Sequence, residues 1–302
     1  MSQQRARQAI LGAGGVGGLI GAVLARAGHD VTLVVRPGTE ESYPDVLSLE
    51  SPFGSVTARA RVVAELQQPA DVLWIAVKAT QLPAAIAQIG AHIEVGAMVP
   101  LLNGIDHIAL LRDRFGDDRV IAATIAVESE RVAPGQIVHR SPFARLRVSA
   151  RGRPRLTDSL EALGDFGFDC AFLDDEVTLL WSKLVFLAPV ALSTTAARAA
   201  IGEVLANEEK REKLKACVRE ACAVAIAVGA QVNAEAVIAN IAALPKGTRS
   251  SMQKDQANGR PLELDAIAGP ILRGGERFSI PVPVTAELTR ACAAASLHMV
   301  TQ

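Results

Sequence analysis

A glycine-rich segment near the start of the sequence has the spacing of a dinucleotide-binding loop. The motif G-x-G-x-x-G begins at Gly12, directly after a predicted strand at Gln8–Leu11 and at the head of a predicted helix at Val16–Ala27. Gly12 allows the tight turn, Gly14 lets the backbone approach a pyrophosphate, and Gly17 lets the helix pack closely on the sheet. The N–H groups of a helix start bind phosphate, and the alternative is a glycine-rich helix start without a ligand. The predicted cofactor-binding residues of this segment are Gly12, Gly14, Gly15, Val16 and Gly17.

The residue after the next predicted strand, Asp30–Val35, indicates which dinucleotide binds. Sites specific for NAD place Asp or Glu about 20 residues beyond the glycine motif, where the carboxylate binds the ribose hydroxyls. This chain has Arg36 there, followed by Pro37 and Gly38, and no carboxylate. A guanidinium can pair with the 2′-phosphate of NADP through charge-assisted hydrogen bonds. The sequence therefore predicts NADP as the cofactor with Arg36 as a ligand, and the alternative is a solvated loop arginine.

The elements that must position these residues change in character along the chain. In the first part, short apolar runs alternate with helical segments, and a turn at residues 52–54 separates the strands of a predicted hairpin. Later strands at Val120–Val127, Gln136–His139 and Ala144–Ser149 are expected to continue the same sheet. Beyond Asp174 the pattern is helical. The sequence thus predicts an α/β protein: a Rossmann-like dinucleotide-binding domain, residues 1–174, followed by an all-helical domain, residues 175–302.

Composition narrows the classes of partner. The chain has 302 residues, of which 50% are hydrophobic, and a formal net charge of −1, which offers no basic surface to nucleic acid or to an anionic membrane. No apolar run reaches the roughly 18–20 residues of a membrane span, so we expect a cytoplasmic protein. The four cysteines form no CxxC pair, so neither a metal site nor a disulfide framework is predicted.

Four further segments, together with the glycine motif, make the chain resemble the ketopantoate reductase (2-dehydropantoate 2-reductase) family. They begin at Val77 with VKATQ, at Leu102 with LNG, at Trp181 with WSKL, and at Ser250 with SSMQKD, which runs on to Glu263-Leu264-Asp265. They follow the family's order and cover nearly the whole chain. The resemblance implies a Rossmann domain joined to a helical domain, an active site in the cleft between them, and NADPH-dependent reduction of a 2-oxo acid to a 2-hydroxy acid.

The resemblance also implies roles for individual residues. Lys183 matches the proton donor, and Glu263 matches a carboxylate beside the catalytic centre. The remaining matches are Lys78 and Asn103, which line nicotinamide and substrate, Gln81, which touches the cofactor, and Ser251, a ligand of the substrate carboxylate.

Physical chemistry supports these roles and leaves an alternative for each. Hydride attack on a ketone builds negative charge on oxygen, which a positioned ammonium stabilises and then protonates. Lys183 lies in a predicted apolar helix, where a lysine also snorkels to solvent. Lys78 ends an apolar strand on the side where open α/β sheets bind ligands, and the alternative is a surface lysine. Asn103 fits a plain turn, and Glu263 fits a solvated carboxylate at a helix start.

The sequence departs from the family at two positions that bear on the substrate. Members that reduce ketopantoate carry asparagines one and two helical turns after the lysine, where this chain has Leu187 and Ala191. The i+4 and i+8 spacing keeps both positions on the lysine's face of the helix. An apolar wall there favours a more apolar 2-oxo acid or ketone.

The expected partner is therefore a small-molecule 2-oxo acid or ketone, with no nucleic acid and no membrane. The apolar faces of the helical half are compatible with a homodimer. The alternative to an active reductase is a non-catalytic NADP-binding regulatory protein that has kept the fold, although retention of Lys183, Glu263, Asn103 and Ser251 argues against it.

Overall fold

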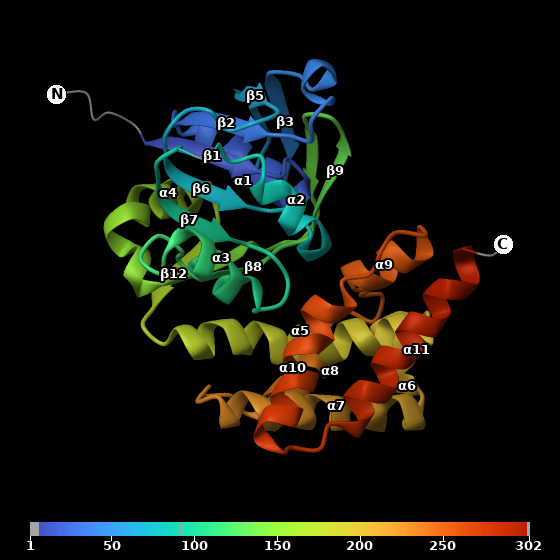
Figure 1. Ribbon diagram of the computed structural model, residues 1–302. Coiled ribbons are helices and arrows are strands. Elements are labelled where there is room, and N and C mark those ends of the chain that lie inside the picture. Colours follow the sequence, from blue (N-terminus) through green and yellow to red (C-terminus); the bar gives the residue numbers. More distant parts are fainter. Residues whose placement is uncertain (1–5, 91, 301–302) are drawn as a thin grey trace. The chain divides into compact units, whose positions relative to one another are not determined.

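The computed structural model describes residues 6–90 and 92–300, and the chain forms two compact units (Figure 1). The first runs to Leu102 and resumes over His107–Leu179. The second comprises Asn103–Asp106 and the chain from Leu180 onward. The predicted division at residues 174 and 175 did not foresee the short segment Asn103–Asp106, which packs with residues far away in the sequence.

A parallel five-stranded sheet with the order β5-β2-β1-β6-β7 forms the centre of the first unit. Its strands are β1 (Arg7–Leu11), β2 (Asp30–Val34), β5 (Arg61–Val63), β6 (Ala70–Ile75) and β7 (Val95–Pro100). Helices accompany it along the chain: α1 (Gly15–Arg26), α2 (Leu82–Ile86), α3 (His107–Phe115) and α4 (Arg153–Phe166). Strands β1, β2, β6 and β7 are mostly buried, as in sheets covered on both faces, and the edge strand β5 is partly exposed. A Rossmann-like sheet followed by helices confirms the predicted fold class.

Two smaller sheets complete the first unit, and they correct the expectation that the later strands continue the parallel sheet. One has the order β4-β3-β10-β9 and the other β12-β11-β8. The first contains β3 (Val46–Glu50), β4 (Val56–Arg59), β9 (Ser129–Ala133) and β10 (Gln136–His139), and the second contains β8 (Ala123–Ala126), β11 (Arg145–Ser149) and β12 (Asp169–Leu173). The β3–β4 hairpin is antiparallel, as predicted. Its other edge pairs in parallel with β10, and this pairing takes β10 away from the main sheet.

The second unit is helical within the described residues. Its helices are α5 (Glu176–Ala197), which begins in the first unit, α6 (Ile201–Ala206), α7 (Glu208–Ala227), α8 (Ala234–Ala242), α9 (Ser251–Ala257), α10 (Leu264–Phe278) and α11 (Pro283–Val300). Glu220 of α7 stabilises the start of α11 by accepting hydrogen bonds from the N–H groups of Val284 and Thr285, at 2.9 and 2.7 Å. A carboxylate at a helix start satisfies donors that have no partner within the helix.

Helix α5 has the length and hydropathy of a membrane-spanning helix, and 67% of its most apolar window is buried inside the protein. Pro189 lies within it and is buried. Burial of this kind is typical of a core helix, whose apolar side chains pack against other helices. The first turn of α5 stays with the first unit, where Glu176 forms an ion pair of 2.7 Å with Arg112.

Candidate active site

The register of the parallel sheet brings three predicted site segments to one edge. Leu11 of β1 pairs with Val34 of β2 on one side and with Ile75 of β6 on the other. The three strands therefore end level with one another. The segments that follow them carry the glycine motif, Arg36 and Lys78, so all three begin at the carboxyl edge where open α/β sheets bind ligands.

The glycines of the loop are required for different structural reasons, which appear when a Cβ atom is built on each of them. Gly12 has a φ of +97°, and a Cβ built on it would lie 2.6 Å from a methyl group of Val77. A Cβ on Gly17 would lie 2.1 Å from the carbonyl oxygen of Gly12, and one on Gly15 would lie 2.1 Å from that of Ser129. At Gly14 nothing lies within 4 Å of such an atom. Packing thus accounts for three glycines, and the open space at Gly14 leaves room for a ligand close to the backbone.

The start of α1 fits the phosphates of a dinucleotide. Gly14 caps the helix without a side-chain hydrogen bond, and the first turn has no acidic residue among the residues described. The first N–H groups of an α-helix have no partner within the helix, and the helix dipole makes this end attractive to anions. A pyrophosphate would supply both the acceptors and the negative charge.

The other predicted cofactor ligands of the first unit lie at the ends of β2 and β6. Arg36 is exposed, and the chain before it is held by Gln88, whose Nε2 donates to the carbonyl of Val35 at 2.6 Å. Lys78 is half-buried directly before a short 3-10 helix, and Gln81, the last residue of that helix, is exposed. The structure thus presents the Arg36 guanidinium to solvent at the edge of the sheet, where a 2′-phosphate could reach it.

A second group of predicted residues meets in the helical unit. Asn103 donates from Nδ2 to Oε2 of Glu263 at 3.2 Å. Glu263 precedes α10 and is only 7% exposed. Gly104 has a φ of +82°, and a Cβ there would lie 2.2 Å from the carbonyl oxygen of Ala266. The backbone of the Asn103–Asp106 segment therefore lies directly against the first turn of α10, which explains why this segment belongs to the second unit.

The same unit contains the ammonium group that the sequence singled out. Burial lowers the pKa of Lys183 to about 8, and the nearby Glu263 carboxylate opposes this by favouring the charged form. At neutral pH the ammonium is still the main species, yet it gives up its proton far more readily than an ordinary lysine. Lys183, Glu263 and Asn103 thus form one group that combines an ammonium, a carboxylate and an amide.

Ser251 lies at the first residue of α9 and is exposed. Its neighbour Ser250 caps this helix by accepting a hydrogen bond from the N–H of Gln253 at 3.1 Å. The hydroxyl of Ser250 also contacts that of Thr194 on α5, at 2.9 Å. This hydroxyl pair links the start of α9 to the helix that carries Lys183. Sequence reasoning missed this contact, since Ser250 belongs to the SSMQKD motif whereas Thr194 lies 56 residues earlier, outside every motif.

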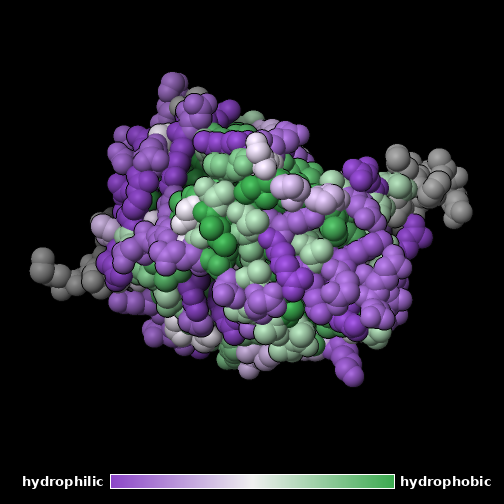
Figure 2. All heavy atoms as spheres, turned by 90° about the horizontal axis from the view of Figure 1, so that it is seen from below, coloured by the Kyte–Doolittle hydropathy of each residue, from purple (hydrophilic) through white to green (hydrophobic). Residues whose placement is uncertain are grey.

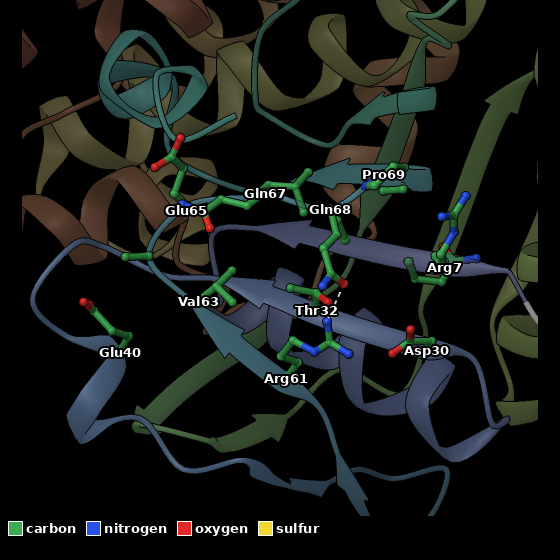
Figure 3. A pocket seen from close by; sticks show the side chains of 15 residues that line it. Arg7, Asp30, Thr32, Glu40, Arg61, Val63, Glu65, Gln67, Gln68 and Pro69 are labelled. Atoms are coloured by element: carbon green, nitrogen blue, oxygen red, sulfur yellow. Dashed lines mark hydrogen bonds between the residues drawn. The ribbon is translucent and has the colours of Figure 1, made fainter. Parts of the chain in front are cut away.

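A cavity of about 430 Å³ is lined by residues of β1, β2 and β5 and by the segment that connects β5 to β6 (Figure 3). Several of its polar side chains are paired: Arg61 with Gln68, and Arg7 with Asp71, whose pKa is lowered by this hydrogen-bonded partner. None of the predicted site residues lines this cavity. No group of His, Cys, Asp and Glu residues suited to a metal ion occurs in the described part of the chain.

A parallel sheet with a glycine loop, joined in one chain to a helical unit in which a partly buried lysine lies near a carboxylate, is typical of dinucleotide-dependent oxidoreductases. Family models agree with this class. The model described as ketopantoate reductase PanE/ApbA matches residues 8–151, and the model of its C-terminal part matches residues 177–296. The chain belongs to the ketopantoate reductase family.

Named relatives and solved structures cover almost the entire chain. The 2-dehydropantoate 2-reductase of Caulobacter vibrioides is 30% identical, over 96% of this chain and 99% of that protein. The structure of a ketopantoate reductase from Ralstonia eutropha JMP134 superposes with a TM-score of 0.85 and 26% identity, covering 96% and 98% of the two chains. D-mandelate dehydrogenase, solved with NADH and anilino(oxo)acetate, has the same TM-score at 20% identity, with 97% and 99% covered, and shows the fold alone.

We predict that Lys183 titrates near pH 8 and that Glu263→Gln lowers its pKa further, because the carboxylate that favours the ammonium is lost. NMR titration of lysines labelled with ¹³C at Cε measures both values. Lys213 is the internal control, since its ion pairs with Glu209 and Glu287 raise its pKa to about 12. An ordinary value for Lys183, or no decrease in the variant, would contradict this electrostatic account.

Proposed function

We propose that the protein reduces the ketone of a 2-oxo acid to a 2-hydroxy acid with NADPH, and that Lys183 donates the proton. The observation that carries this proposal is the Lys183 ammonium, which burial brings to a pKa of about 8 beside Glu263. The bound dinucleotide would supply a hydride to the carbonyl carbon. Lys183 Nζ would stabilise the charge that develops on the carbonyl oxygen and then transfer a proton to it.

Glu263 and Asn103 support this step. The carboxylate keeps the lysine protonated at neutral pH, and the amide of Asn103 holds Oε2 of the carboxylate through its 3.2 Å hydrogen bond. An ordinary lysine keeps its charged head in water, whereas the Lys183 ammonium is desolvated enough to lower its pKa. This arrangement favours catalysis over the alternative of a regulatory NADP-binding protein.

Lys183→Ala should abolish most turnover while leaving NADPH affinity nearly intact. General acid catalysis contributes about 10²–10⁴-fold, and lost stabilisation of the oxyanion adds to this. In the unmodified protein, kcat should fall as the pH rises above about 8, because the ammonium loses its proton. The measurements are steady-state rates and cofactor titrations, with Lys213→Ala as a matched surface control. If Lys183→Ala kept more than about a tenth of the rate, Lys183 would not be the acid.

The cofactor is proposed to be NADP in preference to NAD, since an exposed guanidinium rather than a carboxylate follows β2. Arg36→Asp should reverse or erase this preference, because a carboxylate repels the 2′-phosphate and can accept from the ribose hydroxyls. Dissociation constants for both reduced cofactors test this, with the exposed loop residue Arg119 changed to Asp as the control. Equal affinity of the unmodified protein for the two cofactors would sink the proposal.

The substrate is proposed to be a 2-oxo acid more apolar than ketopantoate. Beyond Lys183, α5 presents Leu187 and the buried Ala191. The hydroxyl of Thr194, three residues beyond Ala191, is 0% exposed and engaged with the carbonyl of Val190 at 2.7 Å and with Ser250 at 2.9 Å. It is therefore not available to a hydroxyl of the substrate.

We expect a higher kcat/KM for 3,3-dimethyl-2-oxobutanoate than for ketopantoate, which differs by one hydroxyl. A hydroxyl that faces leucine gives up water without gaining a partner, at roughly 1–3 kcal/mol, or about ten- to a hundredfold in rate. Leu187→Asn should shift the preference toward ketopantoate, whereas Leu187→Met should not. A clear preference of the unmodified protein for ketopantoate would show that the apolar-wall argument is wrong.

A homodimer and a cytoplasmic location complete the proposal. Hydrophobic side chains gather in the middle of the face shown in Figure 2, with hydrophilic ones around them. Ile226 on α7 is 57% exposed. One structural neighbour, a ketopantoate reductase from Staphylococcus aureus, is described as dimeric. Sedimentation equilibrium, in which a monomer at micromolar concentration would count against the dimer, decides the first point, and cell fractionation decides the second.

A further inference from the structure

Two hydroxyl groups from distant parts of the first unit hold the glycine loop from outside. The phenol of Tyr43 donates to the carbonyl oxygen of Ala13 at 3.2 Å. The hydroxyl of Ser129, the first residue of β9, donates to the carbonyl oxygen of Gly15 at 2.9 Å. Tyr43 is only 6% exposed and packs in the hydrophobic core, so its ring is fixed. We call this arrangement, formed by Tyr43 and Ser129, the hydroxyl clamp.

The clamp completes the hydrogen bonding of the loop carbonyls on the protein side. The carbonyl between the two clamped ones, that of Gly14, accepts from the N–H of Gly18 at 2.8 Å. The loop is also fixed at its entry, where the N–H of Gly12 donates to the carbonyl of Val34 at 3.1 Å. Three successive carbonyl oxygens, those of Ala13, Gly14 and Gly15, are therefore engaged by protein groups.

Because the peptide bond is planar, a hydrogen bond that fixes a carbonyl also fixes the N–H group of the same peptide. In a trans peptide the carbonyl of one residue and the N–H of the next point in opposite directions. Tyr43 holds the carbonyl of Ala13, and so it orients the N–H of Gly14. Ser129 holds the carbonyl of Gly15, and so it orients the N–H of Val16. Both N–H groups lie at the start of α1, where anions bind.

We propose that Tyr43 and Ser129 are positioning residues for the pyrophosphate of the cofactor, an inference that rests on the proposed function. They fix two peptide planes before the ligand arrives, so that binding does not have to order the loop. Contact between β9 and the loop is close, because a Cβ on Gly15 would lie 2.1 Å from the carbonyl oxygen of Ser129. The clamp and the glycine at position 15 thus belong to one packing arrangement.

Tyr43 also connects this loop to the segment that carries the proposed ligand of the 2′-phosphate. Thr39 bonds to the carbonyl of Arg36 through its N–H at 3.0 Å and its hydroxyl at 2.6 Å. The N–H of Tyr43 bonds in turn to the carbonyl of Glu40 at 3.2 Å. The segment from Arg36 to Tyr43 is therefore folded upon itself and attached to the glycine loop at its end.

The clamp and Arg36 are expected to act on different parts of the cofactor. NADPH and NADH share the pyrophosphate and differ only in the 2′-phosphate. Loss of either clamp hydroxyl should weaken both cofactors by a similar factor, whereas Arg36→Asp should weaken NADPH selectively. This difference separates a pyrophosphate-positioning role from an indirect effect through Arg36.

The test compares Tyr43→Phe and Ser129→Ala with Ser42→Ala. Ser42 is a suitable control because, among the described residues, its hydroxyl bonds within its own segment, to the carbonyl of Thr39 at 3.0 Å. Two quantities are measured: dissociation constants for NADPH and NADH by nicotinamide fluorescence, and amide hydrogen exchange of the glycine loop in the cofactor-free protein. Thermal melting verifies that each variant is folded.

Each clamp variant should raise both dissociation constants by about 3- to 10-fold, the equivalent of one net hydrogen bond, and should speed exchange in the loop. Ser42→Ala should stay within about twofold of the unmodified protein. Unchanged affinities, a loss confined to NADPH, or unchanged loop exchange would each overturn the clamp. If the unmodified protein bound neither cofactor, the proposed function would fall as well. Faster exchange in the cofactor-free variants would then identify a loop clamp without a pyrophosphate role, which also contradicts the proposal.

Discussion

The parallel register of three central strands is the constraint on which the rest of the first unit depends. Leu11 is level with Val34 and with Ile75, so β1, β2 and β6 all end at the same edge of the sheet. A shift of one residue would turn the buried side chains of a strand toward the other face. The register is thus fixed by burial of apolar side chains, and the juxtaposition of the glycine loop, Arg36 and Lys78 follows from it.

Close packing of α1 is the second requirement, and it explains the number of glycines in the helix. Gly17 admits the carbonyl of Gly12, while a Cβ on Gly18 would lie 2.6 Å from Ile137 of β10. The helix is therefore enclosed by the main sheet and by the smaller sheet that contains β10 and β9. The smaller sheet also contacts the glycine loop directly, because its strand β9 carries Ser129, whose hydroxyl bonds to the carbonyl of Gly15.

In the helical unit, two opposing effects determine the charge of the partly buried Lys183. Desolvation alone favours the neutral amine, and Glu263 counteracts it. The lowered pKa of Lys183 also makes the stability of the folded protein depend on pH. Because the pKa in the folded protein lies below the ordinary 10.5, the unfolded chain binds more protons between pH 8 and 10.5, and stability from this group rises with pH across that window. Lys183 therefore contributes least to stability at the pH where it is an ammonium.

The sequence by itself determined the features that are local in the chain. The glycine motif was readable because the strand, the turn and the helix start are contiguous, and the long helices were readable from their apolar pattern. The family followed from five short motifs in order, and the family models confirm it. The end of the short helix α2 is not determined locally in this way. Helix α2 stops at Ile86, and the side chain of Gln88 bonds to backbone carbonyls of Val35 and Ala64 instead.

Tertiary structure decided every feature that joins residues distant in the sequence. The pairing of β10 with β3, the hydroxyl clamp at Ala13 and Gly15, and the position of Asn103 against Glu263 have no local pattern that could predict them. The pKa of Lys183 is a further case, because it depends on how much water the fold removes and on how near the fold brings one carboxylate. Local sequence governs φ, ψ and periodicity, whereas burial and hydrogen bonding between segments exist only once the chain has folded.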